Sequence, residues 1–143
     1  MALRLQDDVR TKIVNEVTIL LSGTAGTPTG TRGTVGYLRI FGGTQPGTGG
    51  ATSGTQGTLC EIVKIGWLVG TTGTAVIAAS RTGTAGSTGT AAWARLSAEN
   101  GTSYIVDGGC GTASTQQFVI DVAGITVDSI ITLSAASIIM PAT

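Results

Sequence analysis

Histidine is missing from this 143-residue chain, and charged side chains are sparse, with eight basic and eight acidic residues. General acid–base catalysis depends on histidine and on carboxylates with shifted pKa values. The acidic residues beyond the N-terminus have neither calcium-loop spacing nor a feature that selects a glycosidase-type pair: Glu61, Glu99, Asp107, Asp121 and Asp128. We expect these carboxylates to be solvated or salt-bridged, and the chain to be no enzyme and to bind no metal and no cofactor.

Cysteine occurs only as Cys60 and Cys110, far apart and outside any Cys-x-x-Cys or Cys/His spacing. A zinc site is therefore not expected. Two buried free thiols, acting as small apolar side chains, are the favoured interpretation. A disulfide between the two residues is the alternative.

Long apolar runs and basic runs are also absent. No stretch approaches the roughly 18 apolar residues of a membrane span, and nothing would drive counterion release from nucleic acid. Asp7 and Asp8 stand where the apolar region of a signal peptide would be. No Gly-Lys-Ser/Thr or strand–GxGxxG–helix unit indicates a nucleotide site. We expect a soluble protein made in the cytoplasm, without a nucleic-acid or membrane partner.

The first 22 residues differ from the rest of the chain. They hold six of the sixteen charged residues and no glycine, and Val9, Ile13, Val17 and Leu20 recur at helical spacing. The pattern predicts a helix over about 7–21, ended by Gly23. Its apolar stripe, widened by Val14, is expected to pack on the sheet of its own subunit, with docking on a partner subunit as the alternative.

The body, residues 23–143, is rich in glycine and threonine and predicts short strands separated by turns. The expected strands are 35–41, 58–69, 75–80, 90–97, 103–106, 116–122, 127–135 and 137–140. Both faces of 58–69 are mainly apolar, which favours cover on both sides or a subunit interface. The spacing predicts a mainly β fold, an antiparallel β-sandwich or jelly-roll-like domain with one N-terminal α-helix, in a single domain overall.

Two long loops are expected, over 23–36 and over 42–57, where Pro46 is the only rigid point. Loops of this length are usually functional or disordered, so they favour a protein whose loops become ordered against neighbours. A merely flexible surface loop is the alternative.

Aromatic residues number six, and two groups of them share strand faces with arginine. Trp93 lies on the same strand face as Arg95, and Arg39 shares a face with Tyr37 and Phe41. Arginine–aromatic faces are common anchors at protein interfaces. Ordinary packing of amphipathic side chains is the alternative.

Several segments together resemble a family of small virion proteins of tailed bacteriophages. They are Leu38-Arg39-Ile40-Phe41-Gly42-Gly43-Thr44-Gln45-Pro46, Gly89-Thr90-Ala91-Ala92-Trp93-Ala94-Arg95, Asp107-Gly108, and Ala123-Gly124-Ile125-Thr126-Val127 leading to Pro141-Ala142. The resemblance implies a capsid decoration (cement) protein, a β-sandwich subunit of a homotrimer on the surface of the virion head, assembled in the bacterial host cytoplasm. Its partner would be the major capsid protein.

The residues expected to contact that partner are Tyr37, Arg39, Phe41, Gln45, Pro46, Trp93 and Arg95. The Gly/Thr enrichment of the loops departs from the family pattern. A tail, baseplate or fibre component is the alternative within virions. A carbohydrate-binding module, with Trp67, Trp93 or Tyr104 as stacking platforms, is the alternative from another class.

Overall fold

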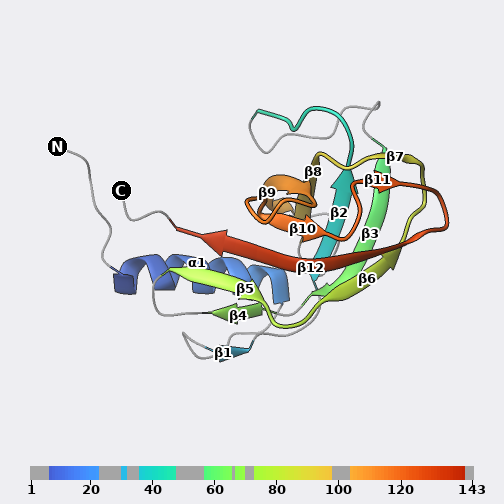
Figure 1. The fold of residues 1–143 in the computed structure, drawn as a ribbon. Helices are drawn as coiled ribbons and strands as arrows, with labels where there is room; N and C mark the ends of the chain where they lie inside the picture. Colours follow the sequence, from blue (N-terminus) through green and yellow to red (C-terminus); the bar gives the residue numbers. More distant parts are fainter. Residues whose placement is uncertain are drawn as a thin grey trace.

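The fold was obtained as a computed structural model, and it describes residues 7–22, 30–31, 36–47, 57–65, 67–69, 73–97 and 104–140. Within these ranges there is one helix, α1 (Asp7–Ser22), and the elements that follow it are strands (Figure 1). The strands are β1 (Gly30–Thr31), β2 (Gly36–Phe41), β3 (Thr58–Ile65), β4 (Trp67–Val69), β5 (Thr74–Ile77), β6 (Arg81–Thr84), β7 (Gly89–Thr90), β8 (Trp93–Ser97), β9 (Tyr104–Gly111), β10 (Phe118–Ile120), β11 (Gly124–Ile125) and β12 (Ile130–Ile139). The predicted mainly β fold with one N-terminal helix is confirmed.

Ten of these strands form one sheet, in the order β1-β4-β5-β12-β10-β9-β8-β2-β3, with β6 also paired to β12. The sheet curls until β3 contacts β6, where a single bridge joins Cys60 to Ala85 and the Gly86 N–H donates to the Leu59 carbonyl at 2.9 Å. The opposing layers of the domain therefore come from one curled sheet. β7 and β11 form a separate two-stranded sheet.

Glycine permits the contact that closes the curled sheet. A Cβ placed on Gly83 of β6 would clash with the Glu61 carbonyl oxygen and meet the Cys60 Sγ at 3.1 Å. The two backbones can approach this closely only because the residue has no side chain. The closure of the sheet therefore depends on glycine at position 83 of β6, a strand that has no apolar side chain.

All described strand pairs are antiparallel except β9 and β10, which pair in parallel through Phe118–Cys110 and Val119–Gly111. Parallel neighbours normally need a crossover of a dozen or more residues. Here six residues suffice, 112–117, because the strands overlap at only these two registered positions. The expected antiparallel sheet is therefore mixed at this one place.

Strand boundaries differ from expectation at several places. The strand expected over 75–80 ends at Ile77, and the unexpected β6 follows it. The segment 90–97 divides into β7 and β8, 103–106 extends to Gly111 as β9, and 116–122 shortens to β10. The two strands expected over 127–135 and 137–140 are one continuous strand, β12, which pairs with β5, β6 and β10 along its length.

The core lies inside the curl of the sheet. Its fully buried members include Leu38, Ile40, Ile62, Leu96 and Phe118. Cys60 and Cys110 are buried free thiols, as the sequence predicted. Of the strand expected to be covered on both faces, β3 buries Leu59, Cys60, Ile62 and Ile65, whereas Val63 is 40% exposed.

Helix α1 packs on the sheet of its own chain, as favoured by its pattern. Val14 is fully buried, Val17 packs against the core, and Val9 at the N-terminal end of the stripe is exposed. The Arg10 guanidinium donates to the Met140 carbonyl from Nε at 2.8 Å, and the Gly73 N–H donates to Thr11 Oγ1 at 3.1 Å. These contacts fix the helix to the start of β5 and the end of β12, beside which it lies in Figure 1.

Gly73 is required at this junction. Its φ is +72°, and a Cβ there would lie 2.5 Å from the Cβ of Arg10. Both the left-handed backbone and the close helix exclude a side chain.

Candidate partner-binding face

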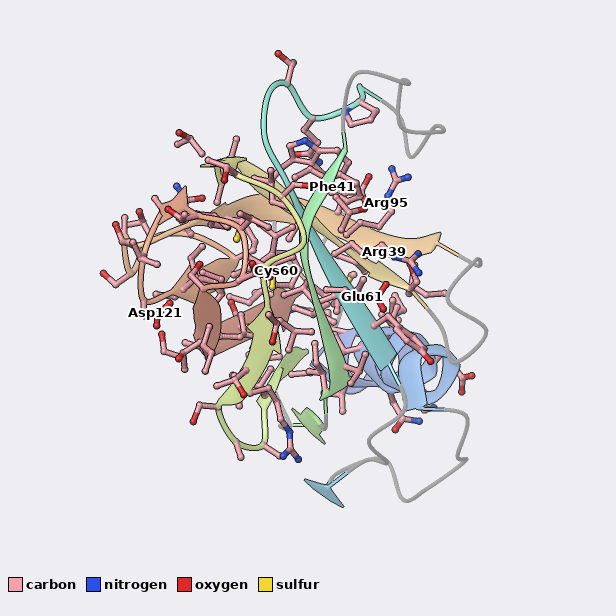
Figure 2. The ribbon with its side chains drawn as sticks, turned by 90° about the vertical axis from the view of Figure 1, so that its right-hand side faces the viewer. Arg39, Phe41, Cys60, Glu61, Arg95 and Asp121 are labelled. Carbon is pink, nitrogen blue, oxygen red and sulfur yellow. The ribbon has the colours of Figure 1, made fainter. Side chains whose placement is uncertain are left out.

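The two arginine–aromatic groups expected from the sequence lie on one face of the sheet. β2 pairs with β8 so that Phe41 stands opposite Trp93 and Arg39 opposite Arg95. Because side chains alternate across a strand, these four residues and Tyr37 point to the same side of the sheet, away from the core residues Leu38 and Ile40. We refer to Tyr37, Arg39, Phe41, Trp93 and Arg95 as the arginine–aromatic face. Figure 2 shows Phe41, Arg95 and Arg39 together along this side, with Asp121 at the opposite side of the molecule.

Phe41 and Trp93 form a stacked pair at one end of this face. Their ring centroids are 4.4 Å apart, with an angle of 15° between the ring planes. The Arg95 guanidinium lies over the Trp93 ring, with its Cζ 5.4 Å from the ring centroid. Both aromatic side chains are buried, so each ring is held in one orientation. A pair of this kind adds about 1 kcal/mol beyond area burial.

A row of charges crosses the face over four strands. The registers Glu61–Arg39, Arg39–Arg95 and Arg95–Asp107 place the four side chains on neighbouring strands β3, β2, β8 and β9. Arg95 donates to both oxygens of Asp107, at 2.6 Å from Nε and 2.6 Å from Nη2. Arg39 Nε donates to Glu61 Oε2 at 2.6 Å. The salt-bridged role expected for Glu61 and Asp107 is therefore observed, and each carboxylate neutralises one of two adjacent arginines.

The two ion pairs differ in exposure, and this decides what each contributes. The Arg95 side chain is 1% exposed and Asp107 is 10% exposed, whereas Arg39 and Glu61 are 28% and 38% exposed. The buried, two-fold hydrogen-bonded pair fixes the geometry of the face. The outer pair is accessible and can exchange its hydrogen bonds with a partner.

The predicted contact residues are therefore not equally available. Phe41, Trp93 and Arg95 are buried in the isolated chain and form the base of the face. Tyr37 and Arg39 are half-buried, and the Arg39 guanidinium lies 6.0 Å from the Tyr37 ring centroid. A buried Trp93 offers no open ring on which a sugar could stack, and the side chains of Trp67 and Tyr104 lie outside the described residues.

Gln45 and Pro46 follow β2 directly. Gln45 is exposed and Pro46 is half-buried. They belong to the loop expected over 42–57, of which 42–47 and 57 are described. Because Phe41 pairs with Thr58, the loop leaves and re-enters the sheet at the same end of the arginine–aromatic face. This loop base borders a hollow of about 530 Å³, lined by Gly42, Gly43, Thr44, Gly57, Leu59, Ser87 and Thr88.

The two thiols have raised pKa values. Burial is the main cause for Cys60, followed by the negative charges of Glu61 and Asp121. Burial and then the neighbouring Cys60 raise the pKa of Cys110 to about 12. Both thiols are therefore protonated at neutral pH and unreactive as nucleophiles.

Among the described residues, no group of three or more His, Cys, Asp or Glu side chains could hold a metal ion. Within the same part of the chain, no helix has the length and apolar character needed to cross a bilayer. Comparison with known proteins gives no match, either to a family model, to a curated protein or to a solved structure.

Proposed function

We propose that this chain is a structural protein of a tailed-phage virion, a decoration (cement) protein that forms a homotrimer and binds the major capsid protein on the outside of the head. One observation carries the proposal. The segments on which the sequence resemblance rests are scattered along the chain, yet their parts between residues 38 and 127 are neighbours in the fold, and Pro141-Ala142 lies outside the described residues.

The first two segments pair as β2 and β8, and Asp107-Gly108 continues the same sheet as part of β9. The fourth segment joins them through the pairing of β11 with β7 and through the Ala91 N–H, which donates to the Ala123 carbonyl at 2.8 Å. This proximity is the observation that supports the proposal, and the apolar side chains of these segments, among them Leu38, Ile40 and Ala94, belong to the core beneath the face.

The construction of this surface suits binding over a wide area. A rigid base, fixed by the Arg95–Asp107 pair and the Phe41–Trp93 stack, carries a loop rich in glycine and threonine. Backbone groups and hydroxyls of such a loop can form many weak hydrogen bonds on a partner. Repetition of those contacts over a symmetric lattice raises the total affinity through avidity.

Co-sedimentation with capsids that lack this protein tests the proposal. Residues 42–57 are replaced by Asn-Gly, a two-residue turn that can join the paired ends of β2 and β3. We expect the shortened chain to remain folded, by circular dichroism, and to lose capsid binding. Unchanged binding would show that the loop plays no part.

A matched pair of arginine variants tests the face itself. Arg39 of β2 and Arg81 of β6 are both half-buried arginines on strands, but only Arg39 belongs to the arginine–aromatic face. We expect Arg39→Ala to weaken capsid binding severalfold and Arg81→Ala to leave it unchanged. Equal effects of the two substitutions would exclude this face as the contact.

A further inference from the structure

We draw no further inference here: the strongest candidate, the hollow of about 530 Å³ at the base of the loop between β2 and β3, belongs to the face already described, and nothing in the structure shows what would fill it.

Discussion

The buried ion pair of the arginine–aromatic face gives the strongest quantitative prediction. Asp107→Ala removes both 2.6 Å hydrogen bonds from a guanidinium that is 1% exposed. Removing one member of a buried pair costs about 3–5 kcal/mol, because the other charge stays desolvated. We expect a loss of about 3 kcal/mol in the free energy of unfolding.

Urea denaturation followed by tryptophan fluorescence measures this loss. With a denaturant slope of about 2 kcal/mol/M, the midpoint should fall by about 1.5 M. Glu61→Ala is the matched control, because it removes the carboxylate from the exposed pair with Arg39. Exposed pairs contribute about 0–1 kcal/mol, so its midpoint should fall by less than about 0.5 M. All proteins are compared at one concentration, since association raises apparent stability.

A double variant separates desolvation from lost packing. Replacing both residues, in Arg95→Leu/Asp107→Leu, removes the buried charge together with its partner. It should therefore be more stable than Asp107→Ala alone. Equal midpoints for Asp107→Ala and Glu61→Ala, or a double variant weaker than the single one, would refute this account of the charge row.

Four further predictions concern the core and the stacked pair. Gly83→Val should lower the free energy of unfolding, measured in urea, by more than about 2 kcal/mol, because a side chain there clashes with β3. Gly86→Val is the control. A side chain at that position meets open space, so the free energy of unfolding should change by less than about 1 kcal/mol. Cys60 and Cys110 should resist thiol reagents at pH 8 until the chain unfolds. Since both pKa values are raised in the fold, stability should be full below pH 9 and fall as the pH rises toward about 12, as followed by circular dichroism. Trp93→Phe should cost about 1–3 kcal/mol in thermal unfolding, because the smaller ring leaves a cavity in a site that is 1% exposed. Loss of the indole N–H adds nothing to this cost, since it has no hydrogen-bond partner among the described residues. An unchanged midpoint would contradict this.

Periodicity predicted the elements whose burial is regular. The helix and the strands β2 and β3 carry apolar residues at spacings of 3.6 and 2, and their positions agree closely with the structure. Strand β6 has no apolar residue and was missed, because it owes its place to the approach of Gly83 to β3. Strand β12 was predicted as two strands divided at residue 136, whereas in the structure it is continuous, with two successive exposed residues, Ser134 and Ala135, near its middle.

The candidate face was predicted in its parts but not as a whole. Alternation along one strand placed Arg39 with Phe41, and Trp93 with Arg95. The pairing of these strands depends on the register of residues more than 50 positions apart, which periodicity does not contain. The carboxylate partners of Arg39 and Arg95 follow from the pairing of neighbouring strands in the same way, so the sequence pattern could not identify them either. The parallel pairing of β9 with β10 could not be predicted either, because a connection of only six residues normally indicates an antiparallel hairpin.

The number of copies of this chain in a purified virion tests the central claim most directly. Quantitative mass spectrometry against the major capsid protein measures it. A decoration protein is predicted in hundreds of copies, in a simple ratio to the capsid protein. A few dozen copies or fewer would place the chain in the tail or at a vertex, and its absence from the particle would contradict the structural role itself.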